Sequence, residues 1–167
     1  EAELLLGHAL GLARTAVSAH HGAPVGSEAA DAYEAALRRR EAREPVAYIR
    51  GFREFHGLAF GTDPRALVPR PETELLVDTA IAEIAAPLAS RPRPPGSPEL
   101  RVADIGTGSG AIAVSIVVAL RKRRMDGSVL VIATDASEDA LQLAKENAVG
   151  HAVADRIGFV HADLRPA

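Results

Sequence analysis

The chain has 167 residues, with 19 Lys and Arg against 22 Asp and Glu, which gives a formal net charge of −3 at pH 7. This balance gives no basic field that would draw the chain to nucleic acid or to an anionic membrane. The chain has no cysteine, its six histidines show no zinc-like spacing, and no apolar stretch approaches the ~20 residues that span a bilayer. Together with the lack of a signal peptide, these features predict a cytoplasmic protein without a bound metal.

The first part of the chain has the pattern of a small helical domain. Residues 3–10 and 27–43 are expected to form helices, and the second of these carries Ala32, Tyr33 and Ala36 on one face. The run Arg38-Arg39-Arg40 lies near its end. These arginines could contact an RNA or a partner, but basic residues in a last helical turn also complement the helix dipole, and we favour that simpler interpretation.

The next segment changes to β-forming and aromatic residues. Between residues 45 and 69 these residues are interrupted by glycines, which predicts a hairpin or two short strands. Pro71-Glu72-Thr73-Glu74 then opens a helix, with proline and acids in its first turn, and this helix is expected to end near Pro87. The proline-rich residues 91–98 are expected to form a stiff linker.

From residue 101 onwards, strand and helix patterns alternate. The expected strands are 101–105, 129–134 and 157–161, and the expected helices are 111–120 and 140–147. This order predicts an α/β protein with an open parallel sheet covered by helices. Because the connections between parallel strands are right-handed, the carboxyl ends of all three strands should lie at one edge.

The most informative motif is the glycine turn Gly106-Thr107-Gly108-Ser109-Gly110, which joins the first of these strands to a helix. Glycines without a Cβ atom let a ligand approach the main chain, and the amides at the start of the helix point towards that ligand. The spacing Gly106-x-Gly108-x-x-Ala111 also fits the loose dinucleotide fingerprint. A nicotinamide or flavin enzyme therefore remains an alternative to a site for S-adenosylmethionine (SAM).

Acidic residues near the turn favour SAM. Asp104 precedes the turn, where its negative charge would oppose a pyrophosphate but suit SAM, which carries a sulfonium and an ammonium group. Asp135 ends the next strand, where a carboxylate can accept the ribose hydroxyls of either cofactor. It follows Gly106 by 29 residues, more than the ~20 residues of the dinucleotide pattern.

Two of these acids also have simpler interpretations. Asp135 and Glu138 have the spacing of a capping box at the start of a helix, a role that could coexist with ribose binding. Asp163 follows the third strand and is expected at the same edge of the sheet, but it could equally be a turn or cap residue.

Three segments resemble the successive signatures of the peptide chain release factor glutamine methyltransferases, and the resemblance runs from Glu3 to Asp163. They are Glu44-Pro-Val-Ala-Tyr-Ile-Arg-Gly-Phe-Arg-Glu-Phe-His56, Leu67-Val-Pro-Arg-Pro-Glu-Thr-Glu74 and Asp104-Ile-Gly-Thr-Gly-Ser-Gly-Ala111. The third is generic to SAM-dependent enzymes, whereas the first two are far more specific. The resemblance implies a class I SAM-dependent methyltransferase fold, Rossmann-like with a partial parallel sheet. It would comprise a helical substrate-recognition domain (1–44), a β-hairpin linker (45–70) and the first part of the SAM-binding domain (71–167).

The resemblance also implies roles for individual residues. The family methylates the side-chain amide of the glutamine in the Gly-Gly-Gln motif of release factors, so SAM is the implied cofactor and a release factor the implied partner. The implied cofactor-binding residues are Asp104, Gly106, Thr107, Gly108, Ser109, Gly110, Asp135, Asp163 and Leu164. The implied residues near the entering glutamine are Arg70, Pro71, Glu72 and Thr73.

The chain departs from the family pattern in two respects. The family's catalytic Asn-Pro-Pro-Tyr motif does not occur in these residues. We also expect that residues matching the family's first helices are missing before Glu1. We therefore expect a fragment that alone binds SAM weakly and transfers no methyl group, and we expect a monomer.

Other function classes remain open from the sequence. An N-methyltransferase acting on another amide or on a nucleobase amine would use the same Asn-Pro-Pro-Tyr chemistry. A nicotinamide-dependent oxidoreductase would use the dinucleotide fingerprint. In a third alternative, the helical part and the hairpin act only as an adaptor that binds another protein.

Overall fold

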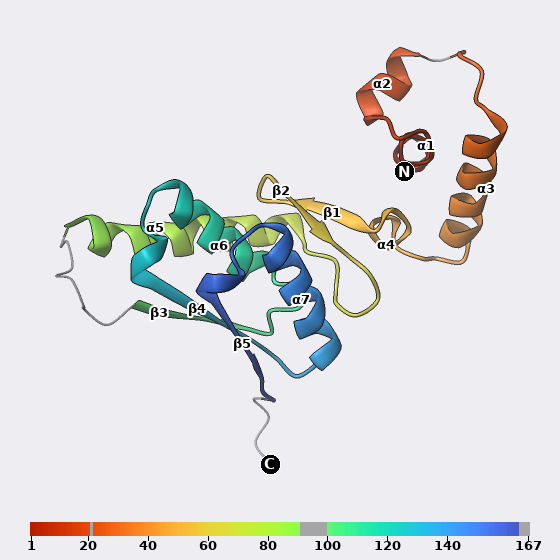
Figure 1. The fold of residues 1–167 in the computed structure, drawn as a ribbon. Coiled ribbons are helices and arrows are strands. Elements are labelled where there is room, and N and C mark those ends of the chain that lie inside the picture. The colour runs from red at the N-terminus through yellow and green to blue at the C-terminus, as the bar shows by residue number, and fades with distance from the viewer. Residues whose placement is uncertain (21, 91–99, 164–167) are drawn as a thin grey trace. The chain divides into compact units, whose positions relative to one another are not determined.

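The computed structural model describes residues 1–20, 22–90 and 100–163. The chain divides into two compact units, Glu1–Gly51 and Phe52–Ala167, and each is described by itself (Figure 1). No helix in these described ranges is long and apolar enough to cross a bilayer.

The first unit is helical. Its helices are Ala2–Leu10 (α1), Arg14–Ala19 (α2), Ser27–Glu41 (α3) and Val46–Arg50 (α4). Helices α1 and α3 confirm the prediction for this part of the chain. Leu5 of α1, Ala36 of α3 and Ile49 of α4 form a common core. The two short helices were not predicted, because five or six residues are too few to show a helical period.

The arginine run at the end of α3 forms ion pairs within its own unit. Arg39 pairs with Glu44 at 2.5 Å and Arg40 with Glu1 at 2.9 Å. Burial is slight at these positions, so each pair contributes little stability. The pairs nevertheless support the structural interpretation of the run over an RNA-binding one.

The second unit contains a hairpin followed by alternating helices and strands. Its strands are Phe52–Phe55 (β1), Leu58–Gly61 (β2), Leu100–Ile105 (β3), Val129–Asp135 (β4) and Ile157–His161 (β5). Its α-helices are Glu74–Ser90 (α5), Ala111–Lys122 (α6) and Glu138–Gly150 (α7), and a 3-10 turn, Pro71–Thr73, leads into α5. The hairpin of β1 and β2 confirms the prediction, although its strands are shorter than the predicted segment.

Strands β3, β4 and β5 form a parallel sheet in that order. Asp104 pairs in register with Ala133, and Asp135 with His161, so the carboxyl ends of the strands share one edge. Helices α5, α6 and α7 lie on one face of this sheet (Figure 1). This arrangement confirms the predicted α/β class with a partial, Rossmann-like parallel sheet.

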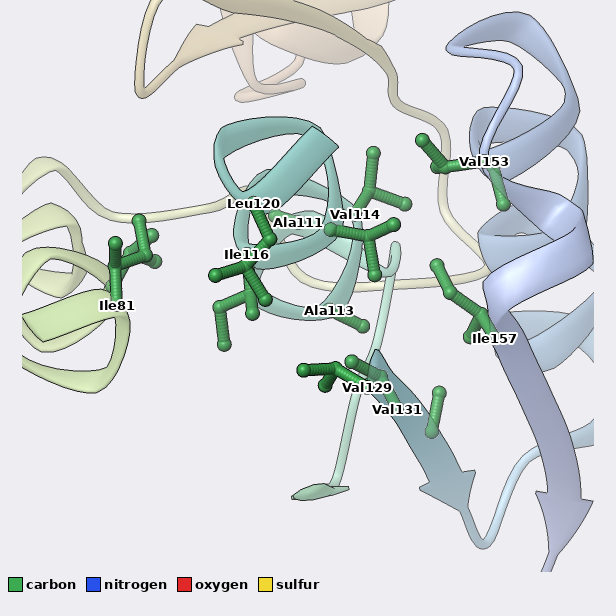
Figure 2. Packing of buried hydrophobic residues seen from close by; sticks show 14 of the residues in the cluster. Ile81, Ala111, Ala113, Val114, Ile116, Leu120, Val129, Val131, Val153 and Ile157 are labelled. Atoms are coloured by element: carbon green, nitrogen blue, oxygen red, sulfur yellow. The ribbon is translucent and has the colours of Figure 1, made fainter. Parts of the chain in front are cut away.

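Helix α6 is the centre of the hydrophobic core (Figure 2). Its residues Val114, Val117 and Leu120 are at most 2% exposed, and they pack in one cluster with Val129 and Val131 of β4. Burial of a Val or Leu side chain contributes about 1.5–3 kcal/mol. This packing fixes the first turn of α6, and with it the glycine turn, against the edge of the sheet.

The predicted end of α5 near Pro87 is wrong. The helix continues to Ser90 with Pro87 inside it. Proline lacks the N–H that would donate to the carbonyl of Glu83, and its ring crowds that carbonyl. The helix nevertheless continues for three residues, and the Ser90 hydroxyl donates to the carbonyl of Ala86 at 2.8 Å in its last turn. The predicted linker 91–98 lies outside the described residues.

Gly110 is the point of closest approach between the glycine turn and α7. It has φ +79°, and a Cβ atom at this position would lie 3.0 Å from the Cβ and 3.1 Å from the Cα of Ala144. Because the second of these atoms belongs to the backbone of α7, the helix itself would have to move. Gly110 therefore sets the spacing between α6 and α7.

We expect Gly110→Ala to lower the free energy of unfolding by about 2–4 kcal/mol, since it combines left-handed strain with overpacking. The matched control is Gly127→Ala, because a Cβ there meets no atom within 4 Å. Thermal unfolding of both variants checks this. If Gly110→Ala had the same melting temperature as Gly127→Ala and the wild type, α7 would not restrict this position.

Candidate functional site

A cavity of about 420 Å³ lies beside the glycine turn, within the ~300–1,000 Å³ typical of small-molecule sites. The glycine turn and the start of α6 form one part of its wall, the segment after the hairpin forms another, and the β4–α7 junction forms a third. The lining residues are Phe55, Arg65, Ala66, Leu67, Val68, Pro69, Arg70, Thr73, Gly106, Thr107, Gly108, Ser109, Ala111, Ile112, Asp135, Ser137 and Ala140.

The glycine turn is folded back onto the end of β4. The backbone amides of Gly106 and Thr107 both donate to the carbonyl of Thr134, at 2.9 and 2.8 Å. The amide of Gly108 donates to Oδ2 of Asp135 at 2.9 Å, and that of Gly110 donates to the carbonyl of Thr107 at 2.9 Å. Four amides of the turn are thus already used inside the protein, and a phosphate would have to compete for them.

Asp104 lies beneath the turn. It is 7% exposed and does not line the cavity. Its Oδ2 accepts hydrogen bonds from the Thr107 hydroxyl at 2.7 Å and from the Ala113 amide at 3.2 Å. Burial raises the pKa of Asp104 above the usual Asp value, the two hydrogen bonds oppose that rise, and the charge of Asp135 adds to it.

Asp135 lies at the tip of β4 and lines the cavity. Its Oδ1 accepts from the amide of Ser137 at 3.0 Å, while Oδ2 accepts from Gly108. The cap of α7 is Ser137, whose hydroxyl accepts from the Ala140 amide at 3.2 Å. The capping-box prediction for Asp135 and Glu138 is therefore wrong, and each oxygen of Asp135 keeps a lone pair for a ligand hydroxyl.

The other predicted cofactor residues differ in their surroundings. Gly106, Thr107, Gly108 and Ser109 line the cavity, whereas Gly110 faces α7. Asp163 is exposed beyond the end of β5 and is not in the cavity wall, and Leu164 lies outside the described residues.

The predicted substrate-proximal residues divide into two pairs. Arg70 and Thr73 line the cavity. Pro71 and Glu72 are exposed and do not line it. The 3-10 turn of Pro71–Thr73 therefore contributes one side chain to the cavity wall.

Most of one wall of the cavity was not predicted from the sequence. We call this wall the roof segment, residues 62–70, and only its last residue, Arg70, was expected to lie near a ligand. Ala66, Leu67, Val68 and Pro69 of this segment line the cavity, and Leu67 is 88% exposed. The only signal in the sequence was the specific motif that starts at Leu67, and that motif does not reveal which residues face a ligand.

A second hollow adjoins the first. It has a volume of about 420 Å³ and shares the ring of Phe55 with the main cavity. Its walls include Arg53, Glu54, His56 and Glu74. The Nε of Arg53 is buried and has no hydrogen-bond partner among the described residues.

The charges at the glycine turn are negative. Asp104 lies below the turn and Asp135 beside it, both near the positive end of the α6 dipole. Of the two arginines in the wall, Arg65 is neutralised by Asp63 and Glu146, whereas Arg70 is exposed. The turn itself therefore suits a cationic or neutral nucleoside better than a pyrophosphate.

The raised pKa of Asp104 predicts a pH dependence of stability. The folded state holds the proton of Asp104 more tightly than the unfolded state, so this residue destabilises the fold as the pH rises above the ordinary value of 3.8. Between about pH 4 and pH 7, the unfolding free energy of the wild type should therefore fall relative to that of Asp104→Asn. Denaturant unfolding across this range measures it, and parallel pH curves for the two proteins would contradict the burial effect.

The comparisons with known proteins support the resemblance found in the motifs. Residues 1–51 match the family described as the PrmC N-terminal domain. The chain is 42% identical over 166 residues to the release factor glutamine methyltransferase of Chlorobaculum tepidum, covering 99% of this chain and 53% of that protein. It is 40% identical over 164 residues to the protein of the same name from Rhodopirellula baltica, covering 98% of this chain and 51% of the relative.

The chain thus spans about half the length of these curated relatives. Among solved structures, it is similar to a SAM-dependent methyltransferase from Geobacter sulfurreducens in complex with S-adenosyl-L-homocysteine. The identity is 26% and the TM-score 0.37, over 56% of this chain and 30% of that one. That likeness is too small to carry the fold assignment, which rests on the sheet topology. The family matches confirm the resemblance to the release factor glutamine methyltransferases.

Proposed function

We propose that this chain supplies the SAM-binding part of a methyltransferase that modifies the glutamine side-chain amide in the Gly-Gly-Gln motif of peptide chain release factors. The observation that carries the cofactor class is the glycine turn, whose amides are already bound to Thr134 and Asp135. The observation that carries the substrate is the identity of about 40% with release factor glutamine methyltransferases across nearly the whole chain.

The cavity wall offers contacts for the ribose and for the methionine part of SAM. Asp135 would accept the ribose hydroxyls through its remaining lone pairs. The open face of Gly106, where a Cβ would meet no atom within 4 Å, would admit the methionine part. Asp163 and Leu164 would border the adenine.

The chain's own residues would prepare the transfer mainly by orientation. SAM supplies an electrophilic methyl group when it is bound. The glutamine amide nitrogen is a weak nucleophile because its lone pair is delocalised into the carbonyl, so the reaction depends on holding it in line with the methyl group. Arg70 and Thr73 line the cavity and would border the entering glutamine, with Pro71 and Glu72 outside it. The Asn-Pro-Pro-Tyr motif that would hold the amide is absent from these residues.

The proposed organisation has three parts. Residues 1–44 would help to hold the release factor, residues 45–70 would connect, and residues 71–167 would bind SAM. The hollow beside Phe55 is lined by the guanidinium-bearing Arg53 and by the carboxylate-bearing Glu54 and Glu74. Such a set suits the backbone amides of a protein substrate, which carry both donors and acceptors. We further propose that the protein acts as a monomer in the cytoplasm.

The direct test uses the full-length protein, a purified release factor and SAM with a labelled methyl group. The expected result is label in the Gly-Gly-Gln peptide and none in a release factor whose motif glutamine is replaced by alanine. Peptide mass spectrometry locates the label. Label confined to another residue, or no label, contradicts the proposed substrate.

We expect Asp135→Ala to raise the dissociation constant for SAM about 10- to 100-fold. A hydrogen bond to a charged group contributes about 1.5–3 kcal/mol, and about 1.4 kcal/mol corresponds to tenfold in affinity. Asp139→Ala in the first turn of α7 is the matched control, because Asp139 is exposed and outside the cavity wall. Calorimetric titration of both variants measures the effect, and equal affinities would remove the ribose role.

A further inference from the structure

The cavity depends on two segments that are far apart in the sequence. The roof segment follows the hairpin, and the glycine turn follows β3, some forty residues later. Ala66 of the roof packs with Ala140 and Leu143 of α7, and its Cβ would lie 3.9 Å from a Cβ on Gly108. A shift of the roof against the turn would therefore change the width of the cavity.

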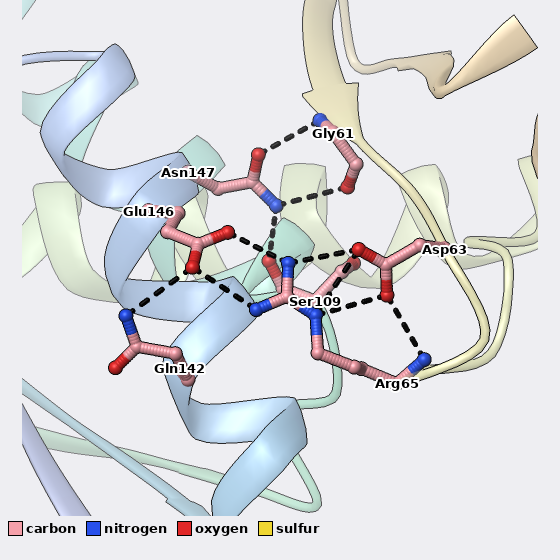
Figure 3. Close-up of polar contacts among 7 residues, drawn as sticks. All are labelled: Gly61, Asp63, Arg65, Ser109, Gln142, Glu146 and Asn147. Carbon is pink, nitrogen blue, oxygen red and sulfur yellow. Dashed lines mark hydrogen bonds and ion pairs between the residues drawn. The ribbon is translucent and has the colours of Figure 1, made fainter.

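One buried side chain joins Gly61, the residue directly before the roof segment, to the glycine turn (Figure 3). Asn147 of α7 is 7% exposed. Its Nδ2 donates to the carbonyl of Gly61 at 3.1 Å and to the carbonyl of Ser109 at 2.9 Å. Its Oδ1 accepts from the amide of Gly61 at 2.8 Å. The last residue of the hairpin and the glycine turn are thus held by a single amide group.

The hydrogen-bond pattern fixes the orientation of this amide. The Gly61 N–H can only donate, so it requires the Oδ1 of Asn147, and the two carbonyls require the two hydrogens on Nδ2. Both hydrogens and the oxygen are therefore satisfied. Buried polar groups with all their partners are rigid, and the loss of one partner leaves the others unpaired.

A second tie lies one residue away on the same helix. Arg65 of the roof donates to Glu146 at 3.0 and 2.7 Å and to Asp63 at 2.8 Å from its Nη2 (Figure 3). These groups are partly exposed, so the pair is weaker than the buried amide. The Arg65–Glu146 pair restrains the roof segment on its solvent-exposed side. Asn147 restrains the chain at Gly61, where the roof segment begins, on the buried side.

We propose that Asn147 is a positioning residue for the cofactor cavity, which sets the distance between the roof segment and the glycine turn through its bonds to Gly61 and Ser109. The identification of the ligand as SAM rests on the proposed function. The restraint of the roof segment rests only on the hydrogen bonds of Asn147. A displacement of about 1 Å in a remote support can lower activity 10²-fold, so a restraint of this kind is a condition for binding.

The test compares Asn147→Leu and Asn147→Asp with wild type in the full-length protein. Leucine has a similar size and removes all three hydrogen bonds. Aspartate keeps the acceptor for Gly61 but turns a carboxylate oxygen towards two carbonyl oxygens. The matched control is Gln142→Leu, an amide of the same helix that is exposed and donates to Glu146.

The expected result has two parts, both measured well below the melting temperature of each variant. The dissociation constant and KM for SAM rise about tenfold in the Asn147 variants, with an unchanged KM for the release factor, and stay within twofold in the control. Without ligand, hydrogen exchange of the Gly61 amide and of the roof segment becomes at least tenfold faster. If Asn147→Leu does not fold, Asn147→Asp and Arg65→Gln carry the test, the latter with a rise of about threefold.

A folded Asn147 variant that is less stable but binds SAM as tightly as wild type would overturn the inference, because Asn147 would then be only structural. Unchanged exchange in the roof segment would overturn it as well. If the wild-type protein binds no SAM, the proposed function fails, and the inference is decided by the exchange measurement alone.

Discussion

The glycine turn is folded onto the tip of β4 by three hydrogen bonds, and the chemistry of the cavity follows from this contact. The amides of Gly106 and Thr107 converge on one carbonyl, and that of Gly108 reaches Asp135. A loop built to hold a pyrophosphate would keep such amides for its ligand. Here two of the amides bind Thr134 and the third holds the carboxylate of Asp135 at the cavity wall. The turn therefore presents a negative charge and exposed backbone to a ligand.

Helix α7 organises the rest of the site. The backbone N–H of its cap residue, Ser137, donates a hydrogen bond to Asp135. Ala144 leaves room for only a glycine at position 110. Two turns from its N-terminus, Glu146 and Asn147 hold the roof segment and the glycine turn. One helix therefore fixes the carboxylate of Asp135, the turn and the roof, which explains why its inward side is lined by small and polar residues as well as by leucines.

Local patterns were sufficient to predict the parallel sheet, its helices, the hairpin and the glycine turn, because apolar periodicity and glycine spacing act over a few residues. They were insufficient for α2 and α4, which are too short to show a period, and for Pro87, which α5 accommodates three residues before its end. They also suggested that Asp135 caps α7, a role that belongs to Ser137.

The site was predicted less completely than the fold, for a physical reason. The glycine motif identified Asp104 and Gly110, and the end of the next strand identified Asp135. Tertiary packing gives the three different surroundings: Asp104 lies under the turn, Gly110 against α7 and Asp135 in the cavity wall. Asn147 gave no signal at all, because its three partners come from segments 38 and 86 residues away. Contacts of that range are decided by packing and leave no local pattern.

The central claim is that the turn accepts a cationic nucleoside and disfavours a pyrophosphate. Calorimetric titration of the full-length protein with SAM and, separately, with NAD tests this most directly. The account predicts saturable binding of SAM and no measurable heat of binding for NAD. Tight binding of NAD together with no binding of SAM would contradict it.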